Sequence, residues 1–485
     1  MLNEGTGTEA AEHSKELYQY DEEFRDSIST VDSSGKRIWL FPKKPSGAYH
    51  NRRIVVTVIL LALFFAGPFI QIGGKPILLL NFFERRFVVF GQAFWPQDFV
   101  LLALTLITLF VFVILFTVVF GRLWCGWACP QTLFMEMVFR KIEYWIEGDA
   151  NQQRRLDRMP WDADKIIKKT AKHVIFIALS VLIAHIAMAY LIGKDQALAI
   201  VQEPPSEHWA GFIGMVVFTG IFYSVFAYFR EQACVVVCPY GRLQGVLLIK
   251  DSIVVAYDWL RGEPRGRRRK PTPQEPKVGD CIDCKLCVHV CPTGIDIRNG
   301  TQLECVNCTA CMDACDDIMV KINKPKGLIR YASYNSIQNG IQRLITPRVI
   351  GYSFVLLALI TVLSFTLATR SDVETTMLKV PGTLFQRTDD GFLTNLYTIE
   401  FVNKTFDPMT LDVKVESPPT ASLVLPEGPV IQLPKEELVK RMCFIKMPES
   451  AITEARTVVT LGIYQDGKLL ERVNVKFIGP VKRKK

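Results

Sequence analysis

Long apolar stretches dominate the pattern of hydrophobic and polar positions along the chain. Five of them reach the length of about 20 helical residues that a bilayer core requires. They run over Ile54–Ile72, Phe99–Phe120, His173–Ile192, Ala210–Phe229 and Val349–Thr369. Because Phe99–Phe120 contains no charged residue, a buried helix of a soluble protein explains it poorly. The pattern predicts a polytopic α-helical membrane domain with five spans.

The pattern changes after the fifth apolar stretch. Thr410–Glu416, Thr457–Tyr464 and Leu469–Phe477 alternate apolar and polar positions or are rich in β-branched residues, which is typical of short strands. Asp466-Gly467 is a hairpin turn signal between the last two of them. Residues 370–485 are therefore predicted to form a C-terminal all-β immunoglobulin-like sandwich.

Positive residues flank the apolar stretches unevenly. The residues before the first stretch, the loop between the second and third, and the segment between the fourth and fifth are rich in Lys and Arg, whereas the loop after the third contains only Lys194. By the positive-inside rule, the N-terminus is predicted on the cytoplasmic side of the membrane and the C-terminal domain on the outer side, which in a bacterium would be the periplasm. This distribution explains the net charge of +9 without a nucleic-acid partner.

Two segments beside the first span are interpreted from their composition. Residues 1–53 are largely polar and show no cleavable signal, which predicts a mobile N-terminal tail in the cytoplasm. Phe82–Trp95 is rich in aromatic residues and includes Arg85 and Arg86, which predicts an interfacial helix or an aromatic belt. The alternative for this second segment is a docking surface for a partner membrane protein.

The chain has 13 cysteines, and all but Cys443 fall into four short, regularly spaced groups. Such groups are typical of metal sites rather than of a disulfide framework, and thiolate ligands imply a reducing compartment. Cys443 lies in the predicted sandwich, where we expect a buried core thiol.

The third and fourth cysteine groups have the spacing of bacterial ferredoxins, in which three close cysteines bind one [4Fe–4S] cluster and the fourth reaches the other. We therefore predict two clusters, although a zinc site is a weaker alternative. Cluster 1 would be held by Cys281, Cys284, Cys287 and Cys315, and cluster 2 by Cys305, Cys308, Cys311 and Cys291. The second half ends in Cys315-Asp316 instead of Cys-Pro, which changes a turn and removes no ligand.

These segments divide the chain into five expected parts. A bacterial 2[4Fe–4S] ferredoxin-like α+β insert separates the fourth span from the fifth. The expected parts are a tail (1–53), a four-span membrane domain (54–248), the ferredoxin insert (249–348), a fifth span (349–369) and the sandwich (370–485).

The first and second cysteine groups are CxxxCP motifs at the ends of the second and fourth spans. Their thiols, named here the thiol quartet, are Cys125, Cys129, Cys234 and Cys238. Cysteines four apart lie on one helix face, and the proline that follows each motif disfavours helix at the second cysteine. Because two spans followed by CxxxCP occur twice, we predict a parallel internal repeat that brings the four thiols together.

The sequence does not identify the metal that the thiol quartet would bind. Soft thiolates select Cu(I), iron–sulfur species or zinc, so copper, an additional iron or iron–sulfur centre and inert buried thiols are all considered. His173 and His185 on the third span are weak candidates for a metal or haem, and hydrogen-bonded structural histidines are favoured. No nucleotide-binding loop is found, so a separate cytoplasmic donor must supply electrons.

Several motifs together resemble one family. WCGWACPQT at 124–132, CVVVCPYGRLQ at 234–244, FWPQD at 94–98, the double ferredoxin motif and the terminal β-domain are similar to the FixG/CcoG family. These are bacterial accessory proteins for assembly of the cbb3-type cytochrome oxidase. Membrane polyferredoxins of nitrate and nitrous-oxide respiration share single CxxxCP motifs but lack this order of spans and the sandwich.

The resemblance implies a membrane-bound iron–sulfur electron-transfer protein that reduces Cu(II) to Cu(I) for the oxidase's haem–copper centre. It also implies membrane lipid, oxidase assembly factors or a copper transporter as partners. Two other functions stay open: a copper-binding scaffold or chaperone without reductase activity, and a quinol-linked electron-transfer subunit of a respiratory complex. The sequence does not decide between a monomer and a homodimer.

Overall fold

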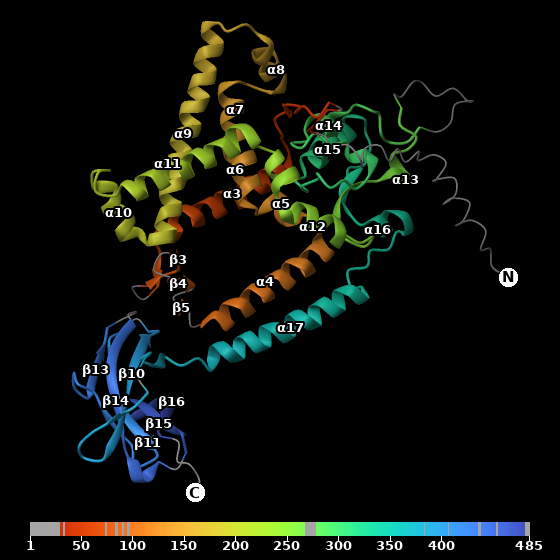
Figure 1. Cartoon of the computed structure of the whole chain (residues 1–485). Helices are drawn as coiled ribbons and strands as arrows, with labels where there is room; N and C mark the ends of the chain where they lie inside the picture. Colours follow the sequence, from red (N-terminus) through yellow and green to blue (C-terminus); the bar gives the residue numbers. More distant parts are fainter. Residues whose placement is uncertain are drawn as a thin grey trace, which may run out of the picture. The chain divides into compact units, whose positions relative to one another are not determined.

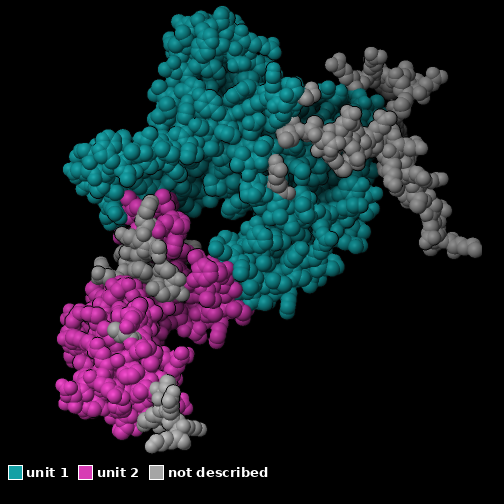
Figure 2. All heavy atoms as spheres, viewed as in Figure 1, with its two compact units in different colours: residues 1–67, 106–189, 194–360 teal, residues 68–105, 190–193, 361–485 magenta. Residues whose placement is uncertain are grey.

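A computed structural model of the chain divides into two compact units (Figure 2). Unit 1 comprises residues 1–67, 106–189 and 194–360, and unit 2 comprises residues 68–105, 190–193 and 361–485. The described residues are 30–32, 34–72, 75–82, 86–89, 92–94, 98–266, 278–382, 384–405, 407–434, 438–452 and 454–480. Most of the predicted N-terminal tail and Trp95–Gln97 of the FWPQD motif lie outside these residues.

Within the part of the chain that the structure describes, five helices are long and apolar enough to cross a membrane, as predicted (Figure 1). They are α3 (Ala48–Ala66, extended by a 3₁₀ turn to Phe69), α4 (Phe99–Phe120), α9 (Ala163–Ile192), α11 (Trp209–Ser224, extended by a π turn to Phe229) and α17 (Pro347–Ala368).

Several helix ends differ from the approximate span boundaries predicted, most clearly at the first and third spans. The first helix begins at Ala48 instead of Ile54. The first span ends at Phe69 instead of Ile72, because Ile72 pairs with Lys75 in a short strand. The third begins at Ala163 instead of His173. Its first turns are too polar for a bilayer, but Lys165 donates to the carbonyls of Asp157 and Met159 at 2.8 and 2.7 Å, which stabilises the extra helical turns.

The described residues after the first span form strands, so an interfacial helix over Phe82–Trp95 is wrong, whereas the aromatic belt and the docking surface stay predictions. β3 (Leu78–Asn81), β4 (Arg86–Val89) and β5 (Gln92–Phe94) make an antiparallel meander. Leu79 and Val88 are paired in register and buried, so apolar alternation rather than an amphipathic helical face decides the local structure.

Short helices surround both CxxxCP motifs in unit 1. The first motif is followed by a chain of turns that packs Phe134 and Phe139 against Phe176 of α9 and Phe226 of the fourth span. These elements are α5 (Leu123–Trp127), α6 (Pro130–Phe134), η3 (Met135–Phe139), α7 (Arg140–Ile146), α8 (Ala150–Arg158), η4 (Val225–Phe229), η5 (Ala233–Val237) and α12 (Pro239–Leu247). A further short helix, α10 (Lys194–Gln202), lies in the loop between the third and fourth spans.

The insert between the fourth and fifth spans is α+β, as predicted. Its two strands, β6 (Val254–Tyr257) and β7 (Ile329–Ala332), pair antiparallel and join the beginning of the insert to its end. The cysteine-bearing helices α14 (Leu286–His289) and α15 (Ala310–Lys321) lie between these strands in the sequence and pack against each other. Flanking turns are α13 (Trp259–Gly262), η6 (Ile297–Asn299) and α16 (Tyr334–Asn339).

The C-terminal part of unit 2 is the predicted β-sandwich. One sheet has the order β12-β14-β10-β8, with β9 also on β10, and the other has the order β13-β11-β15-β16. Cys443 lies fully buried in the common core, as predicted. Asp466 and Gly467 have φ angles of 49° and 81° and form the β15–β16 turn that the sequence predicted.

The strands of the sandwich have the following bounds. They are β8 (Val373–Lys379), β9 (Gln386–Arg387), β10 (Phe392–Asn403), β11 (Met409–Ser417), β12 (Ser422–Val424), β13 (Val430–Leu433), β14 (Leu438–Pro448), β15 (Arg456–Gln465) and β16 (Lys468–Ile478).

Candidate iron–sulfur and thiol site

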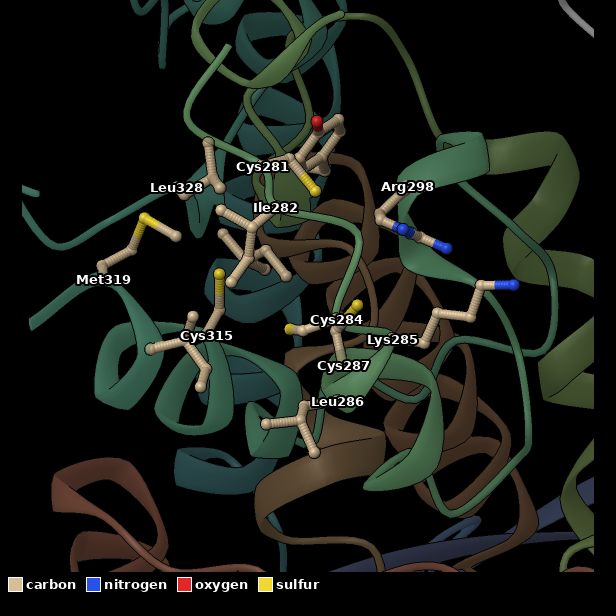
Figure 3. Close-up of a pocket in the computed structure, with 13 residues that line it drawn as sticks. Cys281, Ile282, Cys284, Lys285, Leu286, Cys287, Arg298, Cys315, Met319 and Leu328 are labelled. Atoms are coloured by element: carbon tan, nitrogen blue, oxygen red, sulfur yellow. The ribbon is translucent and has the colours of Figure 1, made fainter. Parts of the chain in front are cut away.

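The insert contains two cysteine-lined cavities. The first is lined by the four cysteines assigned to cluster 1, whose side chains surround it in Figure 3. The second is lined by the four cysteines assigned to cluster 2. Cys287 lines both cavities, so the two are neighbours. The structure thus gathers the eight thiols around two adjoining cavities, and the assignment of each thiol to one cluster stays a prediction.

The donor chemistry of both cavities fits iron–sulfur clusters. The first presents four thiols and the second five, with Cys287 shared, among largely apolar side chains. Burial raises the pKa of Cys287 to about 12, of Cys305 to about 12 and of Cys308 to about 11. The metal-free thiols are therefore protonated near neutral pH, and binding of iron would displace their protons.

The two halves of the insert share an unusual backbone conformation. Asp283 and Lys285 flank Cys284 with φ angles of 52° and 56°, and Asn307 and Thr309 flank Cys308 with φ angles of 53° and 64°. Non-glycine residues adopt positive φ rarely, and such turns direct backbone N–H groups toward one concave side. The repeat of this strained turn at corresponding positions indicates a loop shaped to surround an anionic cluster.

The cavities differ in their access to solvent. Cys284 of the first cavity is exposed, although Cys281 and Cys287 of the same cavity are buried and Cys315 is partly buried. None of the four thiols assigned to cluster 2 is exposed, since Cys308 is buried and the other three are partly buried. An electron donor can therefore approach the thiols of the first cavity more closely than those of the second.

Both CxxxCP motifs interrupt their helices at the second cysteine. Cys129 has φ −64° and ψ 125°, Cys238 has φ −68° and ψ 114°, and a new helix starts at the following proline. This break was predicted. The expectation that both cysteines of a motif share one helix face is wrong, because the second cysteine is extended and the first of the other motif, Cys234, lies in a π turn.

The four thiols of the quartet lie within electrostatic range of one another. The pKa of Cys125 is raised to about 11, mainly by burial and slightly by Cys129 and Cys238, although the hydrogen bond with Gln244 and the charge of Arg122 lower it. Burial likewise raises the pKa of Cys234 to about 12, with added contributions from the other three thiols. No three Cys, His, Asp or Glu side chains in the described part of the chain are arranged to hold a single metal ion. The thiols are thus near each other without forming a closed single-ion site.

Polar partners of the quartet were not predicted from the sequence. Fully buried Gln244 donates from Nε2 to the Cys125 sulfur at 3.5 Å. The Thr132 hydroxyl lies 3.9 Å from the Cys234 sulfur. Gln244 follows the second motif within CVVVCPYGRLQ, so it supports the first cysteine of the other motif.

The first CxxxCP motif packs directly on the loop of the second cavity. Cys125 contacts the apolar group formed by Val306, Cys308 and neighbouring residues. A Cβ at Gly126 would lie 2.6 Å from the carbonyl oxygens of Val306 and Asn307, so only glycine permits this approach. The motif and the cluster 2 loop therefore form one packed unit.

Buried ion pairs hold the second motif in place. Arg230 has φ 53° at the break between η4 and η5, and its guanidinium binds both carboxylate oxygens of Glu143 at 3.1 and 2.8 Å. Although burial raises the pKa of Glu143, Arg230, Lys172 and Arg140 hold it below its ordinary value. The next residue, Glu231, pairs with Arg140 at 3.3 Å. Some of the basic residues that were used to predict the membrane orientation thus also stabilise the turn at Arg230.

The two candidate histidines have ordinary structural partners. His173 Nδ1 lies 2.8 Å from the Tyr223 hydroxyl, and His185 Nδ1 lies 2.7 Å from the carbonyl of Val181. Neither belongs to a group of metal-ligating side chains among the described residues. The favoured structural interpretation agrees with these contacts.

Comparisons with known proteins agree with this architecture. A family model described as a 4Fe-4S dicluster domain matches residues 229–334, and one described as a 4Fe-4S binding domain matches residues 102–148. A third, described as the IG-like fold at the C-terminal of FixG, matches residues 363–480. The first two indicate that the chain binds iron–sulfur clusters.

Curated relatives match most of the chain. The nitrogen fixation protein FixG of Rhizobium meliloti is 32% identical over 80% of this chain and 81% of its own length. The proteins RdxB and RdxA of Cereibacter sphaeroides are 32% and 35% identical, over 84% and 75% of this chain and 89% and 79% of their own lengths. With its membrane helices, cysteine-lined cavities and terminal sandwich, the chain belongs to the FixG family of iron–sulfur electron-transfer proteins.

Proposed function

We propose that this protein reduces Cu(II) to Cu(I) at the thiol quartet, using electrons taken up by the ferredoxin insert. The observation that carries the proposal is the packing of Cys125 on the loop that contains Cys308, with Gly126 closing the approach. A thiol group next to an iron–sulfur site can receive a metal ion and an electron at the same place.

The chemistry balances with one electron per copper ion. Clusters bound in the two cavities would supply one-electron transfer. Thiolates bind Cu(I) strongly, so the quartet stabilises the reduced product relative to Cu(II). Copper is the substrate in this proposal: it binds to the quartet as Cu(II), gains one electron and leaves as Cu(I).

The proposal includes a location and partners. The basic loops favour the bacterial cytoplasmic membrane, with the N-terminus and the cysteine sites in the cytoplasm and the sandwich in the periplasm. A soluble cytoplasmic protein would donate electrons, and an oxidase assembly factor or a copper transporter would exchange copper with the quartet.

A copper-reduction assay on the purified full-length chain tests the proposal. The protein is reduced anaerobically, freed of reductant and mixed with Cu(II) and a Cu(I)-specific chelator. We expect Cu(I) to form as the reduced clusters oxidise, and Cys125→Ala to slow this at least about tenfold with unchanged iron content. Cys443→Ala, in the core of the sandwich, is the control and should keep the wild-type rate.

Other results would support the competing functions. Copper binding without cluster oxidation would indicate a scaffold or chaperone. Oxidation by a quinone analogue but not by Cu(II) would indicate a quinol-linked subunit. Either outcome would overturn the reductase proposal.

A further inference from the structure

Two buried arginines connect the cluster 2 loop to both CxxxCP segments. Arg53 is 5% exposed and donates from Nε to the carbonyl of Gly126 at 3.0 Å and from Nη1 to the carbonyl of Cys308 at 2.9 Å. Arg122, also 5% exposed, donates to the carbonyls of Leu303 and Gly241, and lies 3.5 Å from the carbonyl of Cys305. Both cations thus touch the backbone of the second cavity.

Neither cation is neutralised locally. No carboxylate among the described residues forms an ion pair with Arg53 or Arg122, and the hydrogen bonds of both go to carbonyl oxygens. Glu136, whose charge also reaches Cys308, is itself paired with Arg140 at 2.9 Å. The second cavity therefore lies in a positive local field.

The first cavity has the opposite balance. Its buried cation, Arg298, is paired with Asp296 at 2.6 Å and with Asp283 at 2.5 Å. Lys285 also lines this cavity but is exposed, so solvent and salt screen its charge. A negative charge added to the first cavity gains less local stabilisation than one added to the second.

Burial and charge act in opposite directions on the second cavity. The weaker solvent access of its thiols disfavours the extra negative charge that reduction brings, whereas nearby buried cations favour it. Two unpaired guanidinium groups at hydrogen-bonding distance from the ligand loop act through a low dielectric, which strengthens their effect. The effect of the two cations on the reduction potential is expected to exceed that of burial.

We infer that Arg53 and Arg122 raise the reduction potential of cluster 2 above that of cluster 1, so that an electron accepted near exposed Cys284 settles beside the thiol quartet. The transfer balances, because one electron leaves cluster 1 and one enters cluster 2. An external one-electron reductant of the flavodoxin or ferredoxin type would reload cluster 1. The two arginines are positioning residues in this account, since neither touches copper.

A redox titration of the full-length, iron-replete protein, followed by electron paramagnetic resonance, tests this inference. Dithionite serves as the reductant and no copper is present. We expect two one-electron steps. Arg53→Gln and Arg122→Gln should each lower the midpoint potential of the higher-potential step by about 59 mV, which corresponds to a tenfold change in the equilibrium constant of a one-electron reduction. Arg298→Gln is the matched control and should move the lower-potential step instead.

Further variants separate charge from folding. Arg53→Lys keeps the positive charge. It should therefore shift the midpoint potential of the higher-potential step by only a fraction of the shift seen in Arg53→Gln. If the Lys and Gln variants shift equally, if Arg53→Gln and Arg298→Gln move the same step, or if none moves, the inference is wrong.

If the Gln variants lose iron, the salt dependence of the two reduction steps in the wild-type protein tests the inference instead. Added salt should shift the lower-potential step of the exposed first cavity and leave the higher step nearly unchanged, because salt does not screen buried cations well. A higher-potential step that is the salt-sensitive one would overturn the inference. The inference deepens the proposed function by giving the electron a direction, but its test omits copper, so either can fail alone.

Discussion

At the scale of single residues, the environment of each cysteine decides what its sulfur can do. The thiols of the insert surround two cavities, whereas those of the quartet are close together and have polar partners. Gln244 is the clearest such partner, because it is fully buried and donates to the Cys125 sulfur. A hydrogen bond to a charged group is worth about 1.5–3 kcal/mol, so its loss should be measurable.

Gln244→Ala should weaken Cu(I) binding by the quartet about tenfold, because the Cys125 thiolate loses its donor. Competition with a calibrated Cu(I) chelator measures this affinity. The control is Gln338→Ala, which removes an exposed glutamine on α16 and should leave the affinity unchanged. Equal affinities in the Gln244 variant and the wild type would show that this contact does not support copper binding.

Glu143→Ala should destabilise the detergent-solubilised protein by about 3 kcal/mol or more, because buried Arg230 and Lys172 lose their partner. The measurement is the thermal unfolding midpoint. Asp164→Ala breaks the exposed pair with Lys168 and should cost less than about 1 kcal/mol. Similar midpoints for the two variants would contradict the structural role of the buried network.

At the scale of elements, close packing connects α5 to the cluster 2 loop. The approach depends on Gly126, where an added Cβ would meet two backbone oxygens that cannot rotate away. Cys125 is held on the same short helix. The distance between the quartet and the second cavity is therefore set by backbone contact rather than by flexible side chains.

Gly126→Ala should slow Cu(II)-driven oxidation of the reduced protein about tenfold, because α5 must move away from the loop. Stopped-flow absorbance of the clusters gives the rate, and iron content should stay at the wild-type level. The control is Gly214→Ala in α11, where a Cβ would meet no atom within 4 Å. A wild-type rate in the Gly126 variant would show that this packing does not limit electron transfer.

Element by element, periodicity and spacing predicted much of the structure. The five spans, the sandwich strands and the grouping of the ferredoxin cysteines follow from local patterns that tertiary contacts did not override. The segment Phe82–Trp95 was misassigned, because aromatic composition does not distinguish a strand meander from an interfacial helix. Gln244, Arg53 and Arg230 were missed as site residues, since their partners lie far away in sequence.

At the scale of the whole molecule, the two units contain different kinds of chemistry. Unit 1 holds all twelve grouped cysteines, and unit 2 combines the strand meander with the sandwich. Within unit 2, buried Asp98 at the start of α4 pairs with Arg370 at 2.6 Å and with Lys404 at 2.7 Å. The aspartate of the FWPQD motif thus anchors the sandwich to the helix, which is a structural role for this motif.

In the proposed function, electrons held by the ferredoxin insert pass to Cu(II) at the thiol quartet. Freeze-quench electron paramagnetic resonance tests it most directly, with reduced, iron-replete full-length protein mixed with one equivalent of Cu(II). We predict that the Cu(II) signal and one equivalent of the reduced iron–sulfur signal disappear together, and that both losses slow in Cys125→Ala. Persistence of both signals in the wild type, or equal rates in the two proteins, would contradict the claim.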